Sequence, residues 1–148
     1  MQSPLTSNRS MPESAVIPVL LYASVPDATA WLCRAFGFTE RLRIGSHRCQ
    51  LNSPGGFGAL VVAQGGSPAV NASNSVMVRI RGIDDHFRTA CANGAKVIQS
   101  PETHMYGERQ YTVADPYGHV WTFSESVQDV DPESWGGEYF GANGNTAA

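Results

Sequence analysis

The sequence predicts an α+β fold made of two copies of one β-α-β-β-β module. Two observations support this prediction. In each half an apolar, strand-like run leads into an amphipathic helix, Val25–Phe36 in the first half and Ile83–Ala92 in the second. The glycines that end these helices, Gly37 and Gly94, lie 57 residues apart, which indicates an internal duplication.

The first module starts with the apolar run 16–22. Ser24 suits the N-cap of the following helix, and Pro26 suits its first turn. Its apolar face is formed by residues at three- and four-residue spacing: Ala28, Trp31, Leu32 and Ala35. Three extended segments follow, at about 41–44, 47–51 and 58–63.

The second module repeats this order after a linker at 65–74. Its first strand is 75–80, and its last three extended segments lie at about 96–99, 109–114 and 120–124. The corner Asp115-Pro116-Tyr117-Gly118 predicts a tight hairpin between the last two strands.

We expect a single domain over 14–140, because 148 residues suffice for one core. It comprises modules 15–65 and 74–126 and a C-terminal segment 127–140. The polar, Gly- and Ser-rich ends 1–13 and 141–148 are predicted to be disordered tails.

Charge and composition exclude several classes of partner. The net charge is −3 without a basic stripe, so we expect no nucleic-acid binding. No apolar run is long enough for a membrane span, and no export signal is evident. The odd number of cysteines, three, does not suggest a disulfide framework, so a cytoplasmic location is predicted.

Two segments resemble a known family: SVPDATAWLCRAFGF at 24–38 and ADPYGHVWTF at 114–123. In these duplicated modules they are similar to the glyoxalase/bleomycin-resistance group of the vicinal-oxygen-chelate superfamily, especially its metal-poor, PhnB-like branch. The resemblance implies that the sheets curl around a ligand cavity. It also implies a homodimer, either domain-swapped or side by side.

In the family's metalloenzymes, His, Glu and Gln side chains at four positions bind the metal, and the resemblance implies which residues of this chain occupy those positions. Here they fall on Ile17, Ser75, Thr122 and the neighbourhood of Gln64. Ile cannot bind a metal, and neutral hydroxyls are poor ligands for a divalent cation. We therefore expect no metal and no cofactor.

The histidines suggest few alternatives. His47 and Cys49 share one face of a predicted strand but lack further ligands, so we interpret them as a surface histidine and a buried cysteine. His119 could act as an acid or base or could cap the corner, and the role of His104 stays open. His86 is expected on a solvated helix face, together with Asp85.

The candidate ligand-binding residues lie on two strands and in aromatic loops. Alternation in strand 120–124 points Thr122 and Ser124 inward, whereas Trp121 and Phe123 pack in the core with Trp31. Trp135 and Tyr139 could form a cavity lid or simply cover a sheet edge. The complete candidate set is Phe57, Ser75, Met77, Tyr106, Thr122, Ser124, Trp135 and Tyr139.

The leading hypothesis is a metal-independent protein that binds a small organic molecule, in the manner of family members that sequester an aromatic or bleomycin-like antibiotic. No catalytic residue is assigned. The main alternative is a metal-dependent glyoxalase, isomerase or dioxygenase of the same superfamily, and a third is a small-molecule sensor or accessory subunit.

Overall fold

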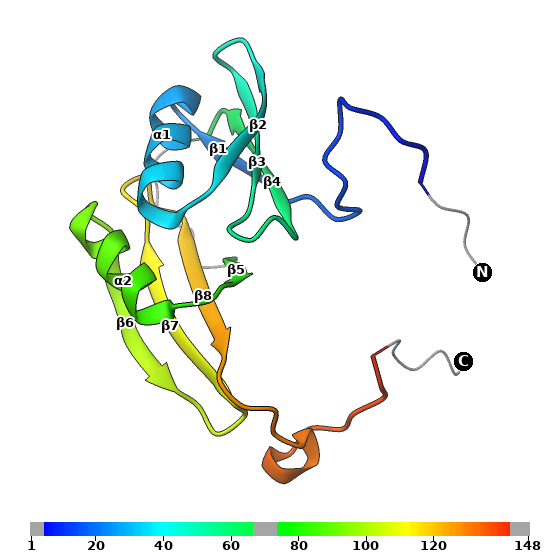
Figure 1. Ribbon diagram of the computed structural model, residues 1–148. Coiled ribbons are helices and arrows are strands. Elements are labelled where there is room, and N and C mark those ends of the chain that lie inside the picture. The colour runs from blue at the N-terminus through cyan, green and yellow to red at the C-terminus, as the bar shows by residue number, and fades with distance from the viewer. Residues whose placement is uncertain (1–4, 67–73, 143–148) are drawn as a thin grey trace.

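A computed structural model describes residues 5–66 and 74–142 and shows two four-stranded mixed sheets, each with one helix (Figure 1). The helices lie on one side of the molecule, and the opposite faces of the sheets curve toward the side where both termini lie. The predicted α+β fold of two β-α-β-β-β modules is confirmed.

The first module has the strand order β1-β4-β3-β2, in which β1 is parallel to β4 and the other neighbours are antiparallel. Its elements are β1 (Val19–Tyr22), α1 (Val25–Phe36), β2 (Thr39–Ile44), β3 (Arg48–Asn52) and β4 (Ala59–Gln64). Helix α1 has the predicted bounds because its end signals are local. The Ser24 hydroxyl accepts from the Asp27 amide at 3.3 Å, and Gly37 ends the helix with φ of 83°.

The second module repeats this topology in the order β5-β8-β7-β6. Its elements are β5 (Val76–Arg79), α2 (Ile83–Ala92), β6 (Lys96–Thr103), β7 (Glu108–Ala114) and β8 (Val120–Ser126), and a short 3-10 helix, Pro132–Trp135, follows. Strand β6 runs well beyond the predicted 96–99 and passes Pro101. It can do so because β6 is an edge strand with two register shifts, where a missing N–H is tolerated.

One core joins the two modules. The Phe36 ring at the end of α1 lies 5.2 Å from Trp121 and 4.7 Å from Phe123, both fully buried on β8. The Tyr22 hydroxyl donates to the Asp115 carboxylate at 2.7 Å, and the Trp31 indole donates to the Asn93 carbonyl at 2.7 Å. Apolar burial and hydrogen bonds therefore fix the modules against each other.

The N-terminal segment 8–16 runs beside the first sheet and contains neither helix nor strand. The Gln50 side chain, 4 % exposed, donates to the Ser10 carbonyl at 2.7 Å, and Arg41 donates to the Arg9 carbonyl at 3.2 Å. Part of the predicted N-terminal tail is thus hydrogen-bonded to β2 and β3. None of the helices in the described parts of the chain has the length and apolarity of a membrane span.

Candidate functional site

A cavity of about 1310 Å³ opens where the two modules meet. The first module contributes Phe38, Leu60 and the β3–β4 hairpin, and the second contributes β5 and the start of α2. The N-terminal segment closes a further side. The residues on its walls are Ser14, Ala15, Val16, Pro18, Phe38, Ser53, Pro54, Gly55, Phe57, Gly58, Ala59, Leu60, Val76, Met77, Val78, Arg79, Ile80, Arg81, His86, Glu125 and Ser126.

The β3–β4 hairpin presents an aromatic ring to this cavity. The Ser53 hydroxyl accepts from the Gly58 amide at 3.0 Å, and the Gly56 amide donates to the Ser53 carbonyl at 2.9 Å. Gly55 and Gly56 have φ of 83° and 81°, a region that glycine enters without a Cβ penalty. This turn leaves Phe57 98 % exposed at the hairpin tip, where its ring is available to a ligand.

The second sheet carries a polar row on the face that points away from α2. The Thr112 and Thr122 hydroxyls lie 2.9 Å apart, and the Ser124 hydroxyl donates to Glu108 at 2.6 Å while it accepts from Gln110 at 3.0 Å. Strand pairing sets Met77 opposite Thr122 and Arg79 opposite Ser124. Hydroxyl, amide, carboxylate and guanidinium groups therefore line one surface.

A smaller cavity of about 560 Å³ lies at the end of this row. Arg79 and Ser126 line both cavities, and the Tyr106 hydroxyl, on the wall of the smaller one, donates to Gln110 at 3.0 Å. The Tyr106 ring stacks on His104 and lies 5.5 Å from Trp135. The Asp131 side chain caps the short 3-10 helix and the left-handed Gly136 ends it, and together they position Trp135.

The structure brings together part of the predicted ligand-binding set. Phe57 and Met77 line the large cavity. Thr122 and Ser124 lie on the polar row beside Met77, whereas Tyr106 lines the small cavity and its ring lies 5.5 Å from Trp135. Two members stand outside both groups: Ser75 is exposed just before β5, and Tyr139 is 64 % exposed in the C-terminal segment.

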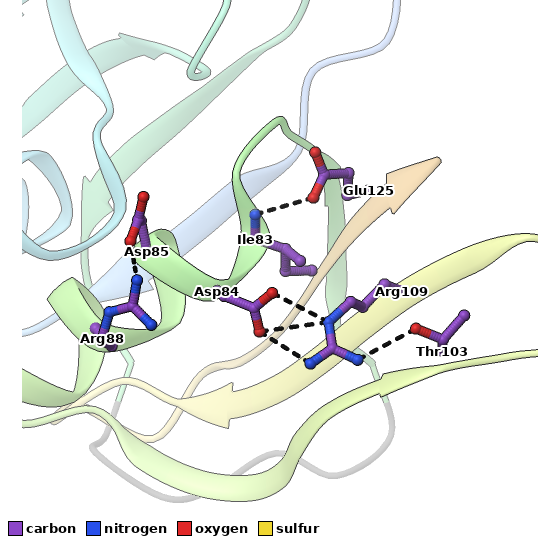
Figure 2. Close-up of polar contacts among 7 residues, drawn as sticks. All are labelled: Ile83, Asp84, Asp85, Arg88, Thr103, Arg109 and Glu125. Atoms are coloured by element: carbon purple, nitrogen blue, oxygen red, sulfur yellow. Dashed lines mark hydrogen bonds and ion pairs between the residues drawn. The ribbon is translucent and has the colours of Figure 1, made fainter. Parts of the chain in front are cut away.

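The N-terminus of α2 is held by side chains from neighbouring strands (Figure 2). Gly82, the N-cap, offers no side chain, and Glu125 on β8 accepts from the Gly82 amide at 2.9 Å and the Ile83 amide at 3.1 Å. Arg109 on β7 pairs with Asp84 at 2.9 Å and also donates to Thr103. Hydrogen bonding to Arg109 lowers the pKa of Asp84, and Asp84 in turn raises the pKa of Arg109.

The expectation of a solvated His86 is wrong, although Asp85 is exposed and pairs with Arg88. The His86 ring bridges the modules, because Nε2 lies 2.7 Å from the Phe36 carbonyl and Nδ1 lies 2.6 Å from the Tyr111 hydroxyl. A carbonyl only accepts, so Nε2 carries the proton and Nδ1 accepts from Tyr111. Burial lowers the pKa of His86, which favours this neutral form.

His119 is held in the corner between the modules. Its Nε2 lies 2.8 Å from the Leu21 carbonyl, and its ring lies 4.5 Å from Tyr22. The His119 amide donates to Asp115, whose two oxygens also accept from Tyr117, Tyr22 and Trp121. These contacts are those of a structural residue at the predicted corner.

The residues at the positions where the family's metalloenzymes bind their metal do not suit a divalent cation. Thr122 is engaged by Thr112, Ser75 is an exposed hydroxyl, and the side chain of Ile17 has no donor atom. Within residues 5–66 and 74–142, no three His, Cys, Asp or Glu side chains gather as a metal site requires. His47 is exposed and Cys49 is buried, so these two share no site.

Residues 18–123 match the family model of the glyoxalase/bleomycin resistance protein/dioxygenase superfamily. The chain belongs to this superfamily. An uncharacterized protein of Mycobacterium tuberculosis is 30% identical over 138 residues, with 80% of this chain and 78% of that protein covered. A Mycobacterium bovis protein, also uncharacterized, is 30% identical, with 80% and 88% covered.

Solved structures of the superfamily share this fold. TioX from Micromonospora sp. ML1 has a TM-score of 0.64 and 30% identity, with 80% of this chain and all of TioX covered. The fosfomycin resistance protein FosX from Listeria monocytogenes has a TM-score of 0.62 and 16% identity, with 78% and 94% covered. At that identity the likeness to FosX concerns the fold alone.

Sequence reasoning missed several cavity residues. Phe38 and Ile80 line the cavity through packing between the modules, whereas His86 carried a local signal, because it shares a helix face with buried Ile83 and Ala90. Arg79 did carry a signal, because strand alternation places it on the same face as Met77.

Proposed function

We propose that this chain is a metal-independent binding protein that sequesters a bulky, partly aromatic natural product and so confers antibiotic resistance. The observation that supports the proposal is the cavity of about 1310 Å³ between the modules. Ligand pockets commonly measure roughly 300–1,000 Å³, so this one has room for a ligand larger than most metabolites.

The cavity walls suit binding by burial and stacking. Leu60, Val78 and Ile80 supply buried apolar surface, and Phe57 and Met77 are exposed at 98 % and 62 %. An aromatic ligand covering these two side chains would remove apolar area from water, which is the main driving force for such binding. Polar groups from the neighbouring row would orient it.

The proposal extends to the state of the protein in the cell. We place the chain in the metal-poor, PhnB-like branch and expect a cytoplasmic homodimer. The metal-dependent enzyme is less well supported, because the donors at the family's ligand positions do not form a coordination shell.

Binding and turnover can be separated with bleomycin and with the aromatic dye 8-anilinonaphthalene-1-sulfonate as probes. The protein is titrated with each by calorimetry, and the ligand is then recovered and examined by mass spectrometry. We expect saturable binding of at least one probe and its recovery unchanged. A chemically altered ligand, or one firmly bound transition metal per chain after dialysis, would contradict the proposal, as would failure of both probes to bind.

Variants locate the binding in the cavity. Phe57→Ala and Met77→Ala should each weaken binding by about tenfold while the unfolding midpoint stays unchanged, because both side chains are largely exposed. Val97→Ala is a matched control, since Val97 is a 47 % exposed apolar residue of the distant strand β6. Equal losses in all three variants would mean that the probe binds elsewhere.

A further inference from the structure

Two arginines line the large cavity and have no carboxylate partner among the residues that the structure describes. Arg79 ends β5, and Arg81 lies between β5 and α2. In the described residues the ion pairs are Glu40–Arg43, Asp85–Arg88 and Asp84–Arg109. Two arginines therefore lie on the wall of a largely apolar cavity in a chain whose net charge is −3.

None of the nearby carboxylates in the described part of the chain forms an ion pair with these arginines, and two of the three are engaged elsewhere. Glu125, on the cavity wall, is held by the Gly82 and Ile83 amides at the positive end of α2. Glu108 accepts from Ser124, and Asp129 lines the small cavity with Arg79 but lies beyond ion-pair distance of it. The charge of the two arginines is thus left for a ligand.

Arg79 is also positioned by its neighbours. One Nη2 N–H donates to the Ser126 hydroxyl at 2.9 Å, which fixes the guanidinium at the boundary shared by the two cavities. A guanidinium has further N–H groups in a planar fork, which matches the oxygens of a carboxylate, sulfonate or phosphate.

We propose that the ligand is an organic anion, with an aromatic or apolar body in the cavity and one acidic group bound by Arg79 and Arg81. This inference rests on the proposed function and names the chemical class of its ligand. Arg79 supplies the fixed contact, and the exposed Arg81 supplies attraction that salt screens.

A matched pair of dyes tests the inference. 8-Anilinonaphthalene-1-sulfonate and N-phenyl-1-naphthylamine share one aromatic body, and only the first carries a negative charge. Fluorescence titration should give the sulfonate at least tenfold tighter binding, with an affinity that falls as salt is added. Arg79→Gln and Arg81→Gln should each remove most of this preference and leave binding of the neutral dye unchanged.

Arg88→Gln is the control, because Arg88 is an exposed arginine of α2 that pairs with Asp85 away from the cavity (Figure 2). The control should bind both dyes as the wild type does. If the neutral dye binds as well as the sulfonate, or the Arg79 and Arg81 variants keep the preference, the anion inference is overturned while the binding function stands. If neither dye nor bleomycin binds, the binding function itself is contradicted.

Discussion

Replacing Asp115 tests how the two modules are held together. Its carboxylate is 1 % exposed and accepts four hydrogen bonds: from the Tyr22 hydroxyl at 2.7 Å, the Trp121 indole at 3.1 Å, and the Tyr117 and His119 amides at 2.9 and 3.0 Å. The first of these crosses from one module to the other. Burial, and then the charge of Asp115, raise the pKa of Tyr22, which keeps its hydroxyl a donor.

The cost of Asp115→Ala follows from the donors left behind. Water can reach the amides of Tyr117 and His119, which are partly exposed, so the loss is carried by the two buried donors of Tyr22 and Trp121. Hydrogen bonds to a charged group contribute about 1.5–3 kcal/mol each, so the free energy of unfolding should fall by about 3–6 kcal/mol. Asp115→Asn keeps one acceptor oxygen and should cost about half as much.

Urea denaturation followed by circular dichroism measures these changes. A double-mutant cycle with Tyr22→Phe isolates the contact between modules, and its coupling energy should be about 1–2 kcal/mol. If Asp115→Ala costs less than about 1 kcal/mol, the network does not hold the modules together and the reasoning fails.

Two further predictions concern pH and the C-terminal segment. Burial lowers the pKa of His86 in the folded protein below its value in the unfolded chain. The unfolded chain therefore binds more protons at acidic pH. The free energy of unfolding should fall by up to about 1.4 kcal/mol per pH unit as the pH drops below roughly 6.5. Urea titrations from pH 7.5 to 5.5 should show this slope, and it should flatten in His86→Phe; an unchanged slope would exclude His86 as its source. Gly107→Ala should free the segment after β8, because a Cβ there would lie 2.1 Å from the Gln128 carbonyl oxygen and φ is 87°. Faster proteolysis within 127–135 is expected. Gly56→Ala is the control, because φ is 81° there but a Cβ would meet no atom within 4 Å, so this variant bears only a backbone strain of about 1–2 kcal/mol. Equal proteolysis of the two variants would contradict the steric argument.

The parts of the fold that depend on neighbouring residues were predictable from the sequence. Helix α1 needs only Ser24 and Gly37 at its ends, and its apolar spacing selects the buried face. The predicted strand 16–22 shortens to Val19–Tyr22, the four residues that pair with Val61 to Gln64 of β4. A strand boundary is thus set by a partner more than thirty residues away.

The site was predictable only in part, for the same reason. Alternation along β8 correctly separates buried Trp121 and Phe123 from Thr122, which bonds Thr112 across the opposite face. His86 shows the limit of such patterns. Helical spacing already places it beside buried Ile83 and Ala90, but its partner, the Phe36 carbonyl, comes from α1 of the other module.

The N-terminal segment is held by its backbone, since Gln50 and Arg41 bond the carbonyls of Ser10 and Arg9 and not their side chains. Substitutions at positions 9 and 10 therefore leave the anchoring groups intact, so this wall of the cavity can diverge in sequence while keeping its place. Substitutions at cavity-lining positions of this segment, such as Ser14 and Val16, would change the side chains that face a ligand and would require no compensating substitution in the sheet. Ligand preference could thus evolve in this segment independently of the fold.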